Sequence, residues 1–362
     1  MNYIGAGLAA LAVTTTAAQA GGIDRSTLPY ALLFEKGRVV ELGFSSASPS
    51  VSGVLPLGPG VPTGNMAENY TSLSFALKGD ISDKLAYVVV ANQPYGADAF
   101  YHTGAYTGLE AHWSSEQLAG LLKYQVSDQV SVYGGLRYVM SRANIFIPPQ
   151  MTGPLGAYTA SASTDAQFGY VAGAAYEIPK IALRVGITYE SAITHKFDTA
   201  ENFANVGSSP GSTTRITMPQ SLAVDFQTGI AANTLLFGSV RWSEWSKWHV
   251  DPAFYRGFVG DEVTGFDNDV ITYQLGIGRK INDNLAVFAR LGYEAPNHDV
   301  ASRLAPTDGM KSIGIGGTWN KDSMKITGGL EYVKLGDATD ASGTRFSGNS
   351  AVGVGVKVDF SF

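Results

Sequence analysis

The end of the chain, Val352-Gly353-Val354-Gly355-Val356-Lys357-Val358-Asp359-Phe360-Ser361-Phe362, alternates without interruption between apolar residues and small or polar ones. Successive side chains of a strand point to opposite faces, so one face of this segment is wholly aliphatic or aromatic. The other face carries glycine, serine and single charges. The segment therefore predicts a strand whose two faces meet different surroundings.

The same alternation recurs along the chain, and no helical periodicity is sustained. It is clear at residues 130–140, 181–190, 272–277 and 285–294. A soluble β-sandwich also alternates, but its water-facing side carries many Lys and Glu residues. Here the polar faces carry glycine, serine and isolated Arg or Glu, and the apolar faces end in Tyr, Trp or Phe. These features favour a membrane barrel with a polar lumen and aromatic girdles.

The connections between these segments alternate between short turns and long loops. Long loops are expected at residues 49–69, 94–112, 144–164, 195–212, 246–267, 295–308 and 336–345. Short periplasmic turns and long extracellular loops are typical of outer-membrane barrels. The sequence therefore predicts an all-β fold, a transmembrane antiparallel up-and-down β-barrel of about 14 strands with both termini in the periplasm. A barrel this wide is a channel or is plugged, because its own side chains do not fill it.

Composition excludes several classes of site. The chain of 362 residues has no cysteine, which excludes disulfides and thiolate metal sites. Its net charge is −6 and it has no basic run, so a nucleic-acid partner is not expected. No metal cluster or cofactor motif is visible. One acidic loop, with Asp251, Asp261, Glu262, Asp267 and Asp269, leaves a weak and unspecific cation site open.

Residues 1–20 read as a secretory signal peptide. An apolar stretch, Ile4–Val13, precedes the small-x-small cleavage site Ala18-Gln19-Ala20, and the stretch is too short to span a membrane. Residues 21–37 are expected to form a short amino-terminal segment, with residues 38–362 as the barrel. This segment carries Leu28, Leu32 and Phe34, which leaves two alternatives: a plug folded into the lumen, or an anchor at the membrane interface.

Two of the expected external loops are unusually apolar. One contains Val51–Gly58; the other contains Ile145–Met151 and continues to Leu155. Exposed apolar patches usually mark binding sites, so we expect capture of a hydrophobic molecule here. The alternative is that these loops pack over the barrel mouth or touch lipopolysaccharide.

Several short motifs resemble the FadL family of outer-membrane transporters for long-chain fatty acids and hydrocarbons, and the resemblance covers essentially the whole mature chain. These motifs are Ala31–Gly53, Asn92-Gln93-Pro94-Tyr95-Gly96, Met218–Ser221, Val240–Ser246 and Pro306–Lys311. One departure is the amino-terminal plug, which is shorter than in the family and has Ser26–Ala31 in place of an Asn-Pro-Ala motif.

The resemblance implies capture at external loops, binding in a barrel pocket, and lateral release beside a kinked third strand at Pro94, Tyr95 and Gly96. Because proline removes a ladder hydrogen bond, Pro94 fits such a kink, although an ordinary strand end explains it equally well. The residues expected to contact ligand are Leu28, Leu32, Phe34, Phe100, Arg142, Phe146, Ile147, Leu155, Trp245, Arg303 and Lys311. Among them Arg142, Arg303 and Lys311 are candidates for meeting a carboxylate head.

For every basic residue a lumenal ion pair is the competing interpretation, because charges inside a barrel need partners. We assign Arg137, Arg184, Arg241 and Arg290 to such a network. Their expected partners are Glu190, Glu294 and Glu331.

The predicted function is outer-membrane transport of a hydrophobic or amphiphilic small molecule by a monomer in contact with outer-membrane lipid and lipopolysaccharide. The main rival is a passive porin for small hydrophilic solutes. An enzyme is not expected, because catalysis by a serine hydrolase needs a Ser, a His and an acidic partner within reach. The histidines lie in or near loops without a nucleophile motif: His102, His112, His195, His249 and His298.

Overall fold

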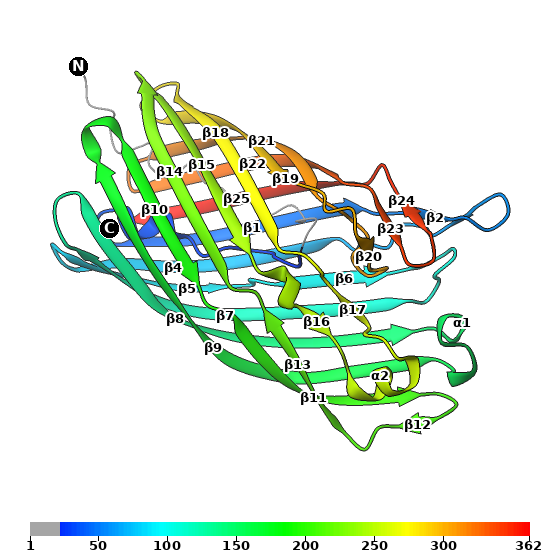
Figure 1. Ribbon diagram of the computed structural model, residues 1–362. Coiled ribbons are helices and arrows are strands. Elements are labelled where there is room, and N and C mark those ends of the chain that lie inside the picture. Colours follow the sequence, from blue (N-terminus) through cyan, green and yellow to red (C-terminus); the bar gives the residue numbers. More distant parts are fainter. Residues whose placement is uncertain (1–21) are drawn as a thin grey trace.

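The computed structural model describes residues 22–362, so the expected signal peptide lies outside the described residues. The chain forms a closed antiparallel barrel of 14 strands, as predicted, because β1 pairs with both β4 and β25 (Figure 1). The wall consists in order of β1 (Val39–Ser50), β4 (Tyr70–Ser82), β5 (Leu85–Asn92) continued by β6 (Gly96–Phe100), β7 (Glu110–Gln125), β8 (Val130–Ile147), β9 (Tyr158–Ile178), β10 (Leu183–Glu190) continued by β11 (Ile193–Phe203), β13 (Ser212–Met218) continued by β14 (Ser221–Ala231), β15 (Thr234–Ser243), β18 (Val270–Lys280), β19 (Leu285–Glu294), β21 (Met310–Lys321), β22 (Met324–Leu335) and β25 (Ser350–Ser361).

Short elements gather at the end of the barrel remote from the carboxy-terminus (Figure 1). A small sheet there joins strands from three loops, and two short helices lie at the same end of the barrel (Figure 1). These elements are β2 (Gly53–Leu55), β3 (Val61–Pro62), β12 (Gly207–Ser208), β16 (His249–Val250), β17 (Thr264–Gly265), β20 (Val300–Ala301), β23 (Ala338–Asp340), β24 (Arg345–Phe346), α1 (Pro149–Thr152) and α2 (Ala253–Val259). The 3-10 turns are η2 (Tyr30–Phe34), η3 (Gly153–Leu155), η4 (Pro179–Ile181) and η5 (Trp245–Lys247). Among the described residues, no helix has the length and apolar character needed to cross a membrane.

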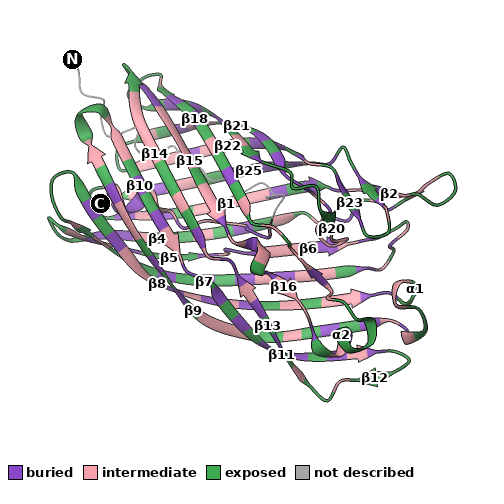
Figure 2. Ribbon diagram, viewed as in Figure 1, coloured by how far each residue is buried: buried purple, intermediate pink, exposed green. Residues whose placement is uncertain are grey.

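Burial along the strands follows the predicted alternation (Figure 2). On β25, Val352 is 48% exposed and faces outward, whereas Gly353 and Asp359 face the lumen and are buried. The outward apolar faces end in tyrosines toward the loop-rich end of the barrel. We call four of these, Tyr170, Tyr273, Tyr293 and Tyr332, the upper girdle; each is 41–52% exposed. The band of exposed apolar residues below them is the surface that meets lipid.

The strands extend farther than predicted, and three of the expected loops were therefore too long. The stretch 94–112 contains β6, the stretch 195–212 contains most of β11, and β8 and β9 extend into 144–164. Beyond the membrane the outward face of a strand leaves the lipid and carries polar residues such as Lys196 and Asp198 on β11, whereas the inner face stays buried. The apolar outer face that marks a spanning strand is therefore lost there. The observed loops are therefore shorter than the expected ones.

Close packing between β7 and β8 gives a stability test. A β-carbon at Gly135 would overlap the backbone carbonyl of Gly120, whereas a β-carbon at Gly120 meets nothing within 4 Å. We expect Gly135→Val to destabilise the barrel by about 1–3 kcal/mol, because backbone cannot move aside as a flexible side chain can. Thermal loss of the compact band on unheated SDS gels measures this. Gly120→Ala is the control, and equal midpoints for the two variants would contradict the prediction.

Candidate ligand-binding site and channel

The amino-terminal segment, residues 22–38, lies inside the barrel and not at the membrane interface (Figure 1). Its residues Leu28, Leu32 and Leu33 are 0–5% exposed and pack on inward-facing side chains of β5 and β7, including Val90 and Leu121. Pro29 precedes the turn η2, which brings Leu32 and Leu33 onto this surface. The segment therefore covers the side of the lumen formed by β5 and β7.

A buried polar network holds this segment. The Tyr30 hydroxyl donates to Glu190 at 2.7 Å, and Glu190 forms an ion pair with Arg137, which is only 1% exposed. Nε of Arg137 donates to Gln117 at 2.8 Å, and one of its terminal nitrogens donates to the Tyr95 hydroxyl at 3.2 Å. One guanidinium thus joins the barrel wall, the amino-terminal segment through Glu190, and the third strand.

The predicted lumenal ion pairs are confirmed for Arg137 with Glu190 and for Arg290 with Glu331, at 2.7 Å in the second case. Arg241 pairs instead with Asp24 of the amino-terminal segment at 2.8 Å. Arg184 lies 4.4 Å from the centre of the Phe34 ring and donates to Gln227. Glu294 accepts a hydrogen bond from Thr272 at 2.7 Å.

The wall is interrupted between β4 and its neighbour, the third strand of the wall, which consists of β5 and β6. Their ladder reaches Phe75 opposite Ala91 and returns only at the bridge between Ala67 and Ala99, in the same register. Between these points the described chain has no ladder pairing across the two strands. Pro94, at the centre of this stretch, has no N–H to donate.

The amino-terminal segment supplies the missing strand partner at this interruption. The amide of Gly96 donates to the Ile23 carbonyl at 2.9 Å, and the amide of Arg25 donates to the Pro94 carbonyl at 2.8 Å. Asp24 and Tyr95 form the bridge between them. The third strand therefore turns from β4 toward the lumen and pairs with the amino-terminal segment.

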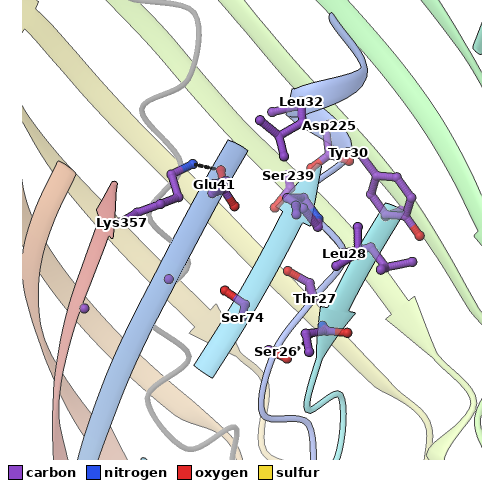
Figure 3. Close-up of a pocket in the computed structure, with 18 of the residues that line it drawn as sticks. Ser26, Thr27, Leu28, Tyr30, Leu32, Glu41, Ser74, Asp225, Ser239 and Lys357 are labelled. Atoms are coloured by element: carbon purple, nitrogen blue, oxygen red, sulfur yellow. Dashed lines mark hydrogen bonds and ion pairs between the residues drawn. The ribbon is translucent and has the colours of Figure 1, made fainter. Parts of the chain in front are cut away.

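Beside the segment lies a cavity of about 300 Å³, which we call the polar cavity (Figure 3). Small and charged side chains line it, including Glu41, Ser74, Asp225 and Ser239, with Leu28 and Leu32 on the amino-terminal side. Lys357 donates to Glu41 at 2.8 Å across its wall. Ser74 lies on β4 at the interruption, whereas Ser239 lies on β15 on another part of the lining.

A second space of about 80 Å³, the apolar pocket, lies nearer the loops. Alanines from β6, β7, β8 and β9 line it, and their short side chains leave the room that the pocket occupies. Aromatic rings and the amino-terminal residue Ile23 complete the lining. The main residues are Ile23, Ala97, Ala99, Ala111, Trp113, Ala143, Ala160, Ala162, Trp248 and Phe266.

Above the apolar pocket the loops pack into a dense cluster. Tyr101, Tyr158, Phe203 and Phe346 are fully buried in it. Val51 and Ile147 of the two apolar loops therefore pack over the barrel mouth, as the alternative interpretation held, whereas Val54 and Leu57 stay exposed.

Arg303 belongs to this loop cluster and is engaged with a carboxylate. Its Nε donates to Asp340 at 3.2 Å. Burial opposes ionisation of Asp340, but hydrogen bonds from Ser342 and Tyr106 outweigh it and hold the pKa of this carboxyl below its usual value. Arg303 thus already has an ionised partner.

The other residues expected at the site are dispersed over the molecule. Leu28, Leu32 and Phe34 line the polar cavity, and Ile147 and Leu155 belong to the loop cluster. Trp245 is fully buried against Tyr95, Phe146 is half-buried on β8, and Phe100 packs on His102. Arg142 and Lys311 are exposed on the outside of the barrel. A role in ligand contact stays a prediction for all of them, and the outward position of Arg142 and Lys311 gives that role no support.

One constellation was not expected. The Ser141 hydroxyl lies 3.0 Å from Nε2 of His195, and Nδ1 of His195 lies 2.9 Å from Asp165. The expectation that no Ser, His and acidic residue come within reach was therefore wrong. They belong to β8, β11 and β9 and are far apart in the chain, so no local motif could have revealed them.

The surroundings of this constellation indicate a structural role. Asp165 also accepts from the amide of Lys196 at 3.2 Å, where the ladder between β9 and β11 is interrupted. Ser141 is 1% exposed and His195 is fully buried, and neither is among the residues lining the two cavities. The three side chains link adjacent strands across a second break in the wall.

The described residues contain no group of three or more His, Asp or Glu side chains arranged to hold a metal ion. In the acidic loop, Asp251 pairs with Arg256 and Glu262 pairs with His249 at 2.9 Å. These carboxylates already have protein partners.

Comparison with known proteins agrees with this architecture. The family model described as "Outer membrane protein transport protein (OMPP1/FadL/TodX)" matches residues 12–361. The chain belongs to this family. A search of curated proteins by sequence finds no match. Members of the FadL/TodX family are outer-membrane channels for hydrophobic substrates, and this chain is such a channel.

Solved structures share the fold at low sequence identity. A FadL homologue from Pseudomonas aeruginosa has a TM-score of 0.75 at 14% identity, covering 92% of each chain. The toluene transporter TodX of Pseudomonas putida has a TM-score of 0.66 at 13% identity, covering 95% of this chain and 96% of its own. The Ralstonia pickettii toluene transporter TbuX has a TM-score of 0.66 at 13% identity, covering 97% of this chain and 100% of its own.

The role of Glu190 in holding the amino-terminal segment can be tested. Glu190→Gln leaves the buried Arg137 without a counter-charge, which costs about 3–5 kcal/mol when one partner of a buried pair is removed. We expect the segment to detach and trypsin to cleave after Arg25 and Lys36 in detergent solution. Glu331→Gln breaks the buried pair with Arg290, which joins β22 to β19 within the wall, and is the matched control. Equal cleavage of both variants would show that Glu190 has no special part in holding the segment.

Proposed function

We propose that this channel takes up compact, neutral hydrophobic molecules, holds them in the apolar pocket, and releases them sideways through the interruption between β4 and the third strand. The observation that carries the proposal is the position of the pocket. Ala97 and Ala99, which line it, lie on β6 directly after the break, and Ile23 belongs to the segment docked there. A ligand in the pocket is therefore adjacent to the opening.

The lining of the apolar pocket supports a neutral substrate. No Lys or Arg is among its lining residues, and the one imidazole, His112, is paired with Asp98. A carboxylate placed there would lose its hydration without gaining a cation, which strongly disfavours binding. The printed names of TodX and TbuX, both toluene transporters, agree with a neutral hydrocarbon. Long-chain fatty acids would have to leave the carboxylate outside this pocket.

A passive pore for hydrophilic solutes fits less well. The buried aromatic cluster of Tyr101, Tyr158 and Phe203 lies between the polar cavity and the loop-rich end of the barrel. A hydrated solute would have to shed water to pass these rings. Liposomes containing the protein should therefore swell slowly in small sugars, and swelling at porin rates would favour the pore.

Filling the apolar pocket tests the binding step. Ala143→Phe adds a ring inside the pocket and should lower uptake of radiolabelled toluene by cells about tenfold, equivalent to about 1.4 kcal/mol. Ala172→Phe places the same ring on the exposed face of β9 and is the control. Unchanged uptake with Ala143→Phe, at equal amounts of folded protein in the outer membrane, would exclude the pocket from the route.

A pair of substitutions in the polar cavity distinguishes lateral release from passage down the barrel. Ser74→Trp and Ser239→Trp each add an indole to this cavity, but only Ser74 lies at the interruption. Lateral release predicts that Ser74→Trp blocks toluene uptake while Ser239→Trp leaves it near the wild-type rate. Equal loss in both variants would favour an axial path toward the periplasm, and loss in Ser239→Trp alone would do so more strongly.

A further inference from the structure

Two lysines face each other on the outside of the barrel. Lys311 on β21 and Lys334 on β22 are direct cross-strand partners, and both are exposed. Side chains directly opposite each other on one face lie about 5 Å apart at Cβ, and like charges there destabilise the sheet. Within residues 22–362, neither lysine forms an ion pair.

Three basic residues that face the lumen do form ion pairs with carboxylates. On the same strand β22, Lys325 pairs with Asp359 at 3.0 Å. Lys357 pairs with Glu41, and Arg290 with Glu331. Lys311 and Lys334 have no such carboxylate on the outer face, so a counter-ion for them must come from outside the described chain.

The position of the lysine pair identifies that partner. Tyr293 of the upper girdle is directly opposite Lys311 on β19, and Tyr332 lies two residues before Lys334 on the same exposed face. Aromatic girdles mark the boundary between the apolar band and the lipid headgroups. Lysine stems can lie along the apolar surface while their ammonium groups reach this headgroup layer.

We propose that Lys311 and Lys334 form a binding site for a phosphate group of lipopolysaccharide in the outer leaflet. Two ammonium groups on adjacent strands can share the oxygens of one phosphate, and such charge-assisted hydrogen bonds are among the stronger ones. The phosphate also removes the repulsion between the two lysines. Bound lipopolysaccharide therefore stabilises the β21–β22 hairpin as well as anchoring the lipid.

The same arrangement occurs at a second place. Lys196 on β11 and Arg215 on β13 are direct cross-strand partners and are both exposed, and Arg142 lies exposed on nearby β8. Asp198 follows two residues after Lys196 on the same face. This group lies beyond the girdle residue Tyr170 along the strands, in the direction of the saccharide layer. We restrict the proposal to Lys311 and Lys334, which lie at the girdle itself.

The test measures binding of lipid A to the purified full chain in detergent. The probe is hexa-acylated lipid A carrying both phosphates, titrated and followed by native mass spectrometry. Lys311→Gln/Lys334→Gln should bind it about tenfold more weakly, equivalent to about 1.4 kcal/mol, because the charges that meet the phosphate are gone. The control is Lys180→Gln/Lys321→Gln, which removes two exposed lysines at the opposite end of the barrel and should bind as the wild type does.

A second variant separates binding from folding. Lys311→Glu places a carboxylate opposite Lys334, so it should raise the thermal stability of the lipid-free barrel while weakening lipid A binding. Dephosphorylated lipid A and inorganic phosphate are probed in parallel, and neither should bind as tightly as lipid A. Equal affinity of the wild type and the double Gln variant, or of lipid A with and without phosphates, would overturn the proposal. Inorganic phosphate binding as tightly as lipid A would assign the site to a free anion and overturn it too.

Discussion

In hydrocarbon every backbone N–H and C=O needs a partner within the protein, and the closed barrel meets this need by pairing each strand on both sides. Two interruptions lie between neighbouring strands of the wall, and at both the chain provides substitute hydrogen bonds. Ile23 and Arg25 pair with the third strand around Pro94. The carboxylate of Asp165 accepts the amide of Lys196 at the other break. An interrupted wall is thus compatible with a stable barrel because the freed groups are bonded again.

This constraint explains how so short an amino-terminal segment can be sufficient. The segment forms backbone hydrogen bonds with the kinked third strand, as a neighbouring strand would. It also packs Leu28, Leu32 and Leu33 against the inner face of the wall. It does not fill the lumen, because the polar cavity lies beside it. Arg137 connects both functions, since it binds Glu190 under Tyr30 and also contacts Tyr95 at the kink. Displacement of the segment would therefore remove hydrogen bonds from the opening as well.

The sequence was sufficient for the barrel because lipid on one side and a wet lumen on the other impose a period of two on every spanning strand. It was insufficient for β11 and the ends of β8 and β9, where the outward face has left the hydrocarbon and carries polar residues. The pocket-lining alanines were missed for another reason. Ala97, Ala143 and Ala160 are inconspicuous singly, and only the cross-strand register brings them around one space. The cluster of Ser141, His195 and Asp165 depends on register in the same way.

The alternation of side chains between the two faces of a strand could have improved the prediction of which basic residues face the lumen. Arg137, Val139 and Ser141 all face the lumen on β8, so the next residue, Arg142, must face outward, as it does. The same reasoning places Lys311 outside, because Ser312 faces inward. The family resemblance made Arg142 a candidate for the ligand head, with Lys311 as a further one, and the alternation by itself gives this role no support because it turns both side chains outward. Inside the barrel Arg137 and Arg290 each meet a carboxylate from another strand. Outside, the anion available to it at the girdle is the phosphate of the surrounding lipid.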